Sequence, residues 1–328
     1  MSPHQETHAN ARRCKFCGGQ SLEVVRNTLR YDVKRNVLKC NTCSFVQLEP
    51  KANEQERYVQ SDNYKNHYGP VPYRPSSCRE IFDTYLSFQK DIIKEIESVL
   101  SDTKSILDIG CQTGHFLHAL KGRIPTRIGL ELNADDVAFI RETLDFPVYE
   151  KPIETAHITE APFDLITAIQ VLEHIENVDS FLEGIARNLK TGGHLYLEVP
   201  NIDDVLVSTF KNKTYEDFFY HEPHLNYFSV KTLGELLAKH GFSGELRTIQ
   251  RYNVLNHLHW ISAHGPQGDF TVGNQTPILA ERAPQDKTLL ADELNTFIQK
   301  ADVEYKAILE KHNVGEVIIF LGTRTHTS

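Results

Sequence analysis

Residues 106–116 read ILDIGCQTGHF, and this stretch decides the fold class. The apolar run around Asp108 predicts a buried strand, and His115 opens a short helical segment. Gly110 and Gly114 lie between them, where glycine lets the backbone turn sharply and approach a ligand closely. A strand, a glycine-bearing turn and a helix in this order are typical of a ligand-binding α/β domain.

The segments on both sides of this turn continue the alternation. Strand patterns occur at residues 104–110, 127–132, 146–150, 163–172, 194–201, 244–253 and 315–323. Helical patterns occur at residues 80–100, 115–122, 133–144, 178–193 and 230–241. Asn133 and Ser229 are expected to cap two of these helices. We therefore predict an α/β fold, with a mostly parallel sheet covered by helices on both faces.

A carboxylate follows the second strand. Glu131 stands 21 residues after Gly110, and a carboxylate in that place can accept hydrogen bonds from both ribose hydroxyls of an adenosine. Gln112 occupies the middle glycine position of a dinucleotide-binding loop and would crowd a pyrophosphate. These residues favour S-adenosylmethionine over a nicotinamide dinucleotide. A glycine turn with a purely structural role is the remaining alternative.

Four of the six cysteines form two C-x-x-C pairs separated by 22 residues. Such pairs in a reducing compartment indicate a metal site before they indicate disulfides. Four thiolates complete the tetrahedron that zinc prefers and leave no coordination position open for substrate. We predict a zinc ribbon within residues 1–50 with a structural ion; unrelated thiols and a redox pair are the alternatives. The expected zinc ligands are Cys14, Cys17, Cys40 and Cys43.

Composition narrows the possible partners. The formal net charge is −9, which disfavours broad binding to nucleic-acid phosphates. The sequence has neither a secretory hydrophobic region at its start nor an apolar run of the roughly 18 to 20 residues that span a bilayer. We therefore expect a cytoplasmic protein without a membrane span, while its oligomeric state stays open.

Four ordered motifs resemble those of class I S-adenosylmethionine-dependent methyltransferases. They are ILDIGCQTGHF, GLELN, FDLITAIQVLEHI and LKTGGHLYLEVPN. The resemblance implies a Rossmann-like, seven-stranded sheet whose last strand is antiparallel. It also implies a cofactor pocket that includes Asp108, Gly110, Cys111, Gln112, Gly114, Glu131, Leu132, Ile153 and Gln170.

The order of the segments along the chain indicates a particular group of methyltransferases. A four-cysteine module, a tyrosine-rich linker (YGPVPYRPSS), a methyltransferase core and the segment YHEPHLNYFS at residues 220–229 are similar to sugar C-methyltransferases. That resemblance places Tyr73, Tyr220, Glu222 and His224 at the active site. The C-terminal segment differs from that group and is more similar to the corresponding segment of methyltransferases in glycan pathways. We expect residues 51–100 to be linker and lead-in helix, and residues 101–328 to be the methyltransferase domain, with an insertion at 201–229 and a mainly helical insertion at 255–312.

A hydroxyl acceptor requires a general base with a pKa near 7, for which histidine is the natural choice. His224 is the first candidate, with Glu222 to orient it; His221 and His174 are further candidates, and Tyr220 is expected nearby. Purely structural roles are the alternative for each of these residues. We expect a sugar acceptor, either nucleotide-linked or a glycan precursor, that is methylated at a hydroxyl or at a carbon. An RNA methyltransferase and a non-catalytic, methyltransferase-like binding module are the competing hypotheses.

Overall fold

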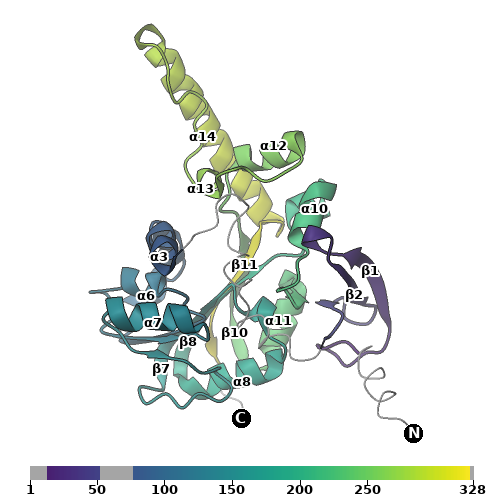
Figure 1. Ribbon diagram of the computed structural model, residues 1–328, viewed down its shortest axis with the longest axis vertical. Helices are drawn as coiled ribbons and strands as arrows, with labels where there is room; N and C mark the ends of the chain where they lie inside the picture. The colour runs from purple at the N-terminus through teal and green to yellow at the C-terminus, as the bar shows by residue number, and fades with distance from the viewer. Residues whose placement is uncertain (1–12, 52–76, 326–328) are drawn as a thin grey trace.

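The computed structural model describes residues 13–51 and 77–325 and contains two sheets (Figure 1). The larger sheet has seven strands in the order β10-β11-β8-β7-β4-β5-β6. Its strands are β4 (Ser105–Ile109), β5 (Thr126–Leu130), β6 (Val148–Tyr149), β7 (Phe163–Ile169), β8 (Leu189–Pro200), β10 (Phe242–Ile249) and β11 (Val317–Arg324). β11 pairs antiparallel with both of its neighbours, and the other pairs are parallel. The predicted seven-stranded α/β sheet with an antiparallel last strand is confirmed.

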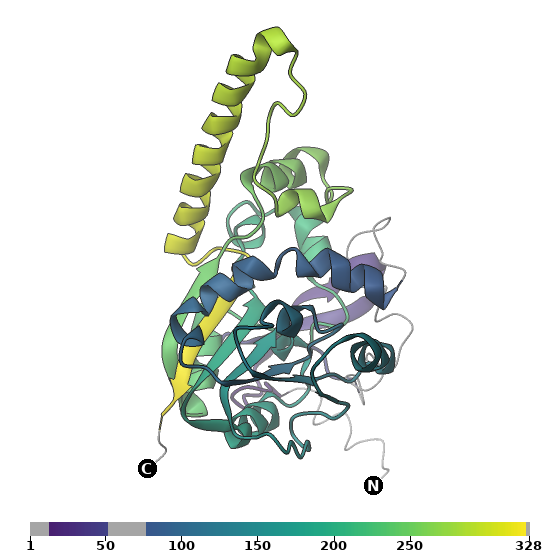
Figure 2. The same ribbon diagram turned by 90° about the vertical axis from the view of Figure 1, so that its left-hand side faces the viewer.

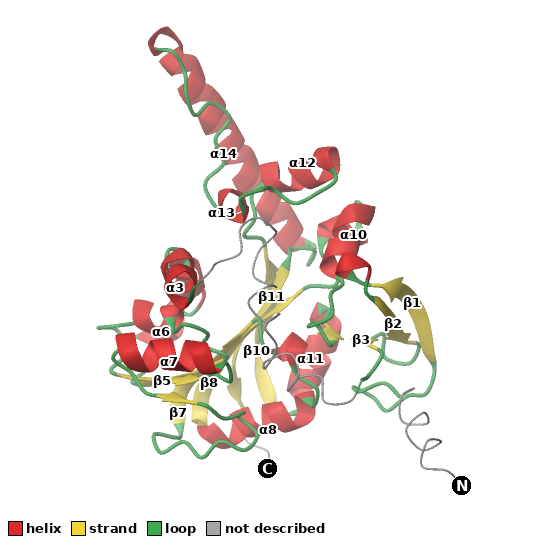
Figure 3. Cartoon of the chain, viewed as in Figure 1, coloured by secondary structure: helices red, strands yellow, loops and turns green. Residues whose placement is uncertain are grey.

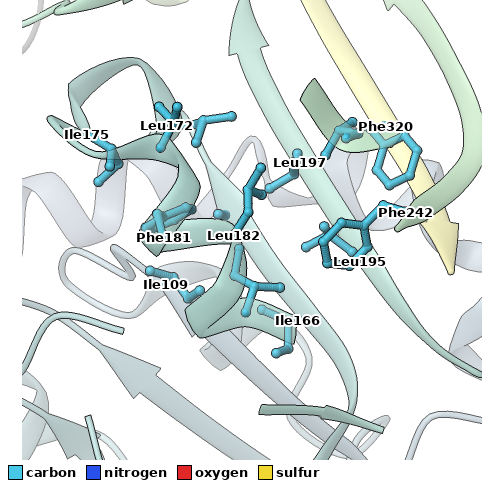
Figure 4. Packing of buried hydrophobic residues seen from close by; sticks show 14 of the residues in the cluster. Ile109, Ile166, Leu172, Ile175, Phe181, Leu182, Leu195, Leu197, Phe242 and Phe320 are labelled. Atoms are coloured by element: carbon cyan, nitrogen blue, oxygen red, sulfur yellow. The ribbon is translucent and has the colours of Figure 1, made fainter. Parts of the chain in front are cut away.

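Helices cover both faces of this sheet, as Figure 3 shows. One layer consists of α3 (Cys78–Leu86), α4 (Gln89–Glu95), α5 (Glu97–Leu100), α6 (His115–Ala119) and α7 (Ala134–Thr143). The other layer contains α8 (Val178–Asn188) and α11 (Val230–Lys239). Because helices cover both faces, all five residues of the central strand β4 are buried. Figure 4 shows Leu182 of α8 close to Leu197 of β8, and Leu195 of β8 beside Phe242 of β10.

The expected caps are present, but two helix boundaries differ from the prediction. Asn133 caps α7, and Ser229 forms a capping box on α11. The predicted helix at 80–100 is divided into α3, α4 and α5; the side-chain amide of Gln89 donates to the carbonyl of Tyr85 at the first break. The helix predicted to reach Gly193 ends at Asn188, because Leu189 is extended and pairs with Phe163 of β7.

The cysteine-rich segment forms the smaller sheet. Its strands are β1 (Leu22–Thr28), β2 (Lys34–Cys40) and β3 (Val46–Leu48), with a 3-10 turn η1 (Arg30–Asp32) between the first two. The fourth strand is β9 (Asn226–Tyr227), which comes from the segment at 201–229 and pairs antiparallel with β3. The small sheet therefore pairs with the residues that directly follow His224 and Leu225 in the chain. The sequence did not predict this pairing.

Two further segments complete the described chain. Residues 201–229 also contain α9 (Val205–Ser208) and α10 (Lys213–Phe219). The region predicted to be mainly helical forms α12 (Val254–Ala263), α13 (Phe270–Gly273), a 3-10 turn η4 (Gln285–Lys287) and the long α14 (Thr288–Lys311). Figure 2 shows α14 extending away from the body of the molecule. Among the described helices, none combines the length and the apolar character that crossing a membrane requires.

Candidate active site

The glycine turn after β4 forms the floor of a cavity. Gly110 and Gly114 have φ values of +69° and +78°, and Gln112 between them has a φ of +50°. A Cβ on Gly110 would lie 2.6 Å from a methyl carbon of Val171. Glycine is therefore required at position 110 both by the backbone conformation and by the lack of space for a side chain.

Glu131 ties this turn to the end of β5. Its Oε2 accepts a hydrogen bond from the backbone N–H of Gln112 at 2.8 Å. Its Oε1 accepts from the N–H groups of Leu132 and Asn133 at 2.7 and 2.8 Å. Burial raises the pKa of Glu131 to about 7, although these three N–H groups favour the ionised form. Burial likewise raises the pKa of Asp108 to about 7, against a hydrogen bond from Thr167.

The cavity has a volume of about 600 Å³, which is within the range of small-molecule sites. Eight of the predicted cofactor residues line it: Asp108, Gly110, Cys111, Gln112, Glu131, Leu132, Ile153 and Gln170. Gly114 lies beneath the turn, where a Cβ would meet Leu144 and Phe146 at 2.7 Å. Tyr73 lies outside the described residues. The volume and the buried carboxylate of Glu131 fit an adenosine-containing cofactor.

The pKa of Glu131 gives a pH-dependent prediction. If Glu131 binds the ribose as predicted, the ribose hydroxyls would donate to its ionised carboxylate, which is present above a pKa of about 7 and is lost as the pH falls below it. We expect the dissociation constant of S-adenosylhomocysteine to rise about tenfold for each pH unit below about 7, the limit for one proton. Calorimetric titrations between pH 5.5 and 8.5 measure this dependence. Glu131→Gln should weaken binding and flatten the profile, and an equally steep profile in that variant would contradict the assignment.

Three of the predicted catalytic histidines line the same cavity. His174 ends the 3-10 turn η3 (Leu172–His174), which directly follows β7, whereas His221 and His224 precede β9. The ring centroids of His174 and His224 are 5.0 Å apart, and those of His221 and His224 are 3.7 Å apart. The structure therefore brings together two segments that lie about fifty residues apart in the sequence.

Hydrogen bonds fasten these two segments to each other. The Nδ1 of His174 donates to the carbonyl oxygen of Pro223 at 2.8 Å, and the N–H of Leu225 donates to the carbonyl of Glu173 at 2.8 Å. The Asn226 amide donates to the carbonyls of Leu172 and Ile175, at 3.2 and 2.7 Å. Pro223, which separates Glu222 from His224 in the sequence, therefore supplies an acceptor that orients His174.

Glu173 is a site residue that the sequence analysis missed. It lines the cavity with only 1 % of its surface exposed. Its Oε1 lies 3.9 Å from Nε2 of His174 and 4.0 Å from Nε2 of His224. Burial raises its pKa to about 8, and nearby Glu198 adds to the shift. The feature of the sequence that could have identified Glu173 is its position directly after the predicted strand 163–172, at the sheet edge where ligands of α/β proteins bind.

Two predicted catalytic residues lie outside the cavity lining. Glu222 is exposed, and its Oε1 pairs with Nζ of Lys51 at 2.9 Å. The ring of Tyr220 packs against that of Tyr227, with 5.0 Å between centroids, and burial raises the pKa of Tyr220 to about 12. Tyr220 and Glu222 thus flank the histidines without facing the space between them and the cofactor loop.

Other charged residues of the cavity were also missed. Arg251 follows β10 and makes a two-pronged ion pair with Glu198 of β8, with 2.6 Å between Nη1 and Oε1. Gln170, at a φ of +56°, donates to Glu198 through both its backbone N–H and its side chain. Arg30 reaches the cavity from the ribbon and lies over the ring of Phe218 at 3.5 Å. Arg251, Glu198 and Gln170 lie near or just beyond the ends of strands of the larger sheet, whereas Arg30 does not.

The four predicted zinc ligands come together in the ribbon. Their Sγ atoms all lie within 4.8 Å of one another, and the pairs Cys14–Cys43 and Cys17–Cys40 are each 3.6 Å apart. Thiolates at 2.3 Å from one zinc ion stand about 3.8 Å apart in a tetrahedron, whereas a disulfide needs about 2.05 Å. The cluster therefore fits zinc, and all four cysteines are free thiols in the structure.

The strand order, the glycine turn and the acidic residue after β5 define a class I methyltransferase fold. The chain belongs to the methyltransferase domain family, whose model matches residues 82–245, half of the sequence. The predicted enzyme class is thereby confirmed for this domain.

Curated relatives match a shorter stretch. A ubiquinone biosynthesis O-methyltransferase from Nitrosomonas europaea is 30 % identical over 115 residues, which are 33 % of this chain and 48 % of the relative. One from Aliivibrio fischeri is 27 % identical over 104 residues, 30 % of this chain and 44 % of the relative. The chain therefore spans less than half the length of these relatives.

Solved structures share a more distant likeness. An S-adenosylmethionine-dependent methyltransferase from Archaeoglobus fulgidus is 17 % identical, with 75 % of this chain and 97 % of that chain covered and a TM-score of 0.48. An amino pentose methyltransferase from Micromonospora echinaspora, involved in calicheamicin biosynthesis, is 23 % identical, with 35 % and 50 % covered and a TM-score of 0.31. TM-scores below 0.5 add no support to the fold described above.

Proposed function

We propose that this protein is an S-adenosylmethionine-dependent methyltransferase that acts on a small-molecule acceptor, namely a sugar that is nucleotide-linked or part of a glycan precursor. One observation carries the proposal: a single cavity is lined both by the cofactor loop and by His174, His221 and His224. The cofactor-binding residues and the residues able to move a proton are thus adjacent, as transfer of a methyl group to a hydroxyl requires.

The cofactor would be held by the residues of the glycine turn and of the strand ends beside it. Glu131 accepts hydrogen bonds from the ribose, Leu132 and Ile153 pack on the adenine, and Asp108 and Gln170 lie toward the methionine end. Bound S-adenosylmethionine supplies an electrophilic methyl group on a sulfonium centre. The close approach of Gly110 to Val171 supports this arrangement, because it keeps the floor of the cavity free of a side chain.

His224 is the candidate general base for the acceptor. Its Nε2 lies 4.0 Å from Oε1 of the buried carboxyl group of Glu173. Because burial raises the pKa of Glu173 to about 8, this group is ionised mainly above pH 8, where it favours the imidazolium that forms when His224 takes a proton. Glu173 therefore takes the orienting role that the sequence analysis gave to Glu222. The relatives from N. europaea and A. fischeri are O-methyltransferases by name, which favours a hydroxyl over a carbon acceptor.

A sugar acceptor is supported by the resemblance of the whole segment order and by a few polar side chains in the lining of the cavity. Gln89, Asp91, Asn274 and Arg30 contribute groups able to bond to sugar hydroxyls. Arg30 also brings a guanidinium that suits the diphosphate of a nucleotide sugar. The four-cysteine cluster would hold one structural zinc ion.

The test is to incubate the purified chain with S-adenosylmethionine carrying a labelled methyl group and to offer three acceptor classes. These are a panel of nucleotide-linked sugars, lipid-linked glycan precursors and total RNA. We expect label in a sugar fraction together with an equal amount of S-adenosylhomocysteine. Label only in RNA, with salt-sensitive binding, would favour an RNA methyltransferase. Cofactor binding without transfer to any class would favour a non-catalytic binding module.

A further inference from the structure

The donor atoms around Glu173 have the character of a metal site. Glu173, His174 and His224 each offer one ligand atom, and these atoms lie within 4.8 Å of one another. Oε1 of Glu173 lies 3.9 Å from Nε2 of His174 and 4.0 Å from Nε2 of His224. Ligand atoms at about 2.1 Å from one ion stand roughly 3.4 Å apart in a tetrahedron. The two separations from Glu173 would need to contract by roughly half an ångström, and the separation between the two histidine nitrogens, at most 4.8 Å, by up to about 1.4 Å, to bring all three atoms onto one ion.

A second, independent observation points to a ligand. Both carboxylate oxygens of Glu173 are buried and have no hydrogen-bond partner within the described part of the chain. A buried ionised carboxylate without a partner costs several kcal/mol, and proteins resolve that cost by protonating it, by pairing it or by coordinating it to a metal. Asp108 and Glu131, in the same cavity, both accept hydrogen bonds. Glu173 differs from them in lacking such bonds.

The orientation of His174 is a third observation. Its Nδ1 donates to the carbonyl of Pro223, and a carbonyl oxygen can only accept, so the proton sits on Nδ1. In the neutral ring the lone pair is then on Nε2, the atom nearest to Glu173. Metal-binding histidines almost always donate their other ring nitrogen to a carbonyl or carboxylate in this way. Pro223 thus holds His174 in the tautomer that a metal ion requires.

We propose that Glu173, His174 and His224 bind one divalent transition-metal ion, with an open coordination position that takes the acceptor hydroxyl. Two imidazoles and one carboxylate are the donor set of catalytic zinc sites and of related iron and manganese sites. His174 and His224 are 25 % and 14 % exposed toward the cavity, which leaves room for a fourth ligand. Coordination lowers the pKa of the bound hydroxyl.

This inference rests on the proposed function. In it His224 is a ligand of the metal ion, and it acts on the acceptor hydroxyl through that ion and not as the base itself. His221 would then be the base within reach, since its ring lies 3.7 Å from that of His224 and lines the cavity. The site differs in kind from the cysteine cluster, where four thiolates fill the coordination sphere. A chelator should therefore distinguish the two sites.

The experiment uses the full-length, tag-free protein. Mild chelation should leave about one zinc per chain in the cysteine cluster, and added Mn²⁺ should then bind at one further equivalent, measured by loss of the free-ion signal in electron paramagnetic resonance. Glu173→Gln keeps the side-chain shape and should weaken Mn²⁺ binding by at least about tenfold. Glu183→Gln, an exposed position on α8, is the matched control. Unchanged cofactor affinity shows that Glu173→Gln is folded.

The outcomes separate this inference from the proposed function. No Mn²⁺ bound to the wild-type protein, or equal binding to Glu173→Gln, would overturn the metal site whatever the acceptor is. If a sugar is methylated, turnover should disappear in the chelated protein and return with Mn²⁺ or Co²⁺. Full turnover after chelation would overturn the metal role and leave the proposed methyltransferase function standing.

Discussion

Replacing His224 by alanine is expected to lower turnover by about 10²- to 10⁴-fold, the range that a positioned proton-handling group contributes. The affinity for S-adenosylhomocysteine should stay within about twofold, because the hydrogen bonds that Glu131 accepts come from the N–H groups of Gln112, Leu132 and Asn133, and none of them involves His224. The measurements are single-turnover rates with a methylated sugar as product, and calorimetric titration of the cofactor product.

A matched control is His312→Ala, which removes an exposed histidine after α14. It should leave both quantities unchanged. Turnover of His224→Ala within about threefold of the wild-type value would remove His224 from the mechanism, both as base and as metal ligand. A large loss of cofactor affinity in the same variant would show instead that His224 holds the cofactor.

Replacing Cys40 by serine is expected to abolish both zinc binding and most of the activity. Cys40 is fully buried at the end of β2, and structural zinc contributes folding energy to such small modules outright. Loss of the ribbon removes β3, the strand that pairs with β9 beside His224. Because a misplacement of about 1 Å at an active site costs about 10²-fold, turnover should fall by at least that factor.

Zinc per chain, measured by mass spectrometry, should fall from about one to near zero in Cys40→Ser. Cys78→Ser is the matched control, because Cys78 lies on α3 outside the cluster and its thiol bonds to Asp136. It should keep its zinc and its turnover. A Cys40→Ser protein that has lost zinc but turns over normally would show that the ribbon does not position the histidines.

The sequence was sufficient for the parts of the fold that local patterns encode. The glycine turn at 110–114, Glu131 after its strand, and the caps at Asn133 and Ser229 are short-range signals, and each is found where it was expected. The spacing of the four cysteines in two C-x-x-C pairs predicts a shared metal site, and their Sγ atoms lie close together in the structure. The antiparallel last strand followed from the family resemblance, because an isolated apolar strand does not reveal its direction.

The rest of the site depends on contacts that no local pattern records. The two residues of β9 form too short a run to show alternation, and their partners in β3 lie about 180 positions away. Glu173 looks like a helix-opening acid in the sequence, and only the packing of residues 223–226 over η3 buries it. Glu198 lies on β8 and Arg251 follows β10, so the two pair only after the sheet has formed.

The pairing of β3 with β9 also sets an order of events during synthesis. All four cysteines lie within the first 43 residues to be synthesised, so they leave the ribosome early and zinc can bind to them then. The last strand of that sheet follows about 180 residues later, which at 5 to 20 residues per second is about 9 to 36 seconds. Throughout that interval β3 is an open edge, to which any extended chain can add. The nascent protein therefore has three of the four strands of this sheet before β9 is made. Pairing of β9, which follows the histidines, then covers the exposed edge of β3.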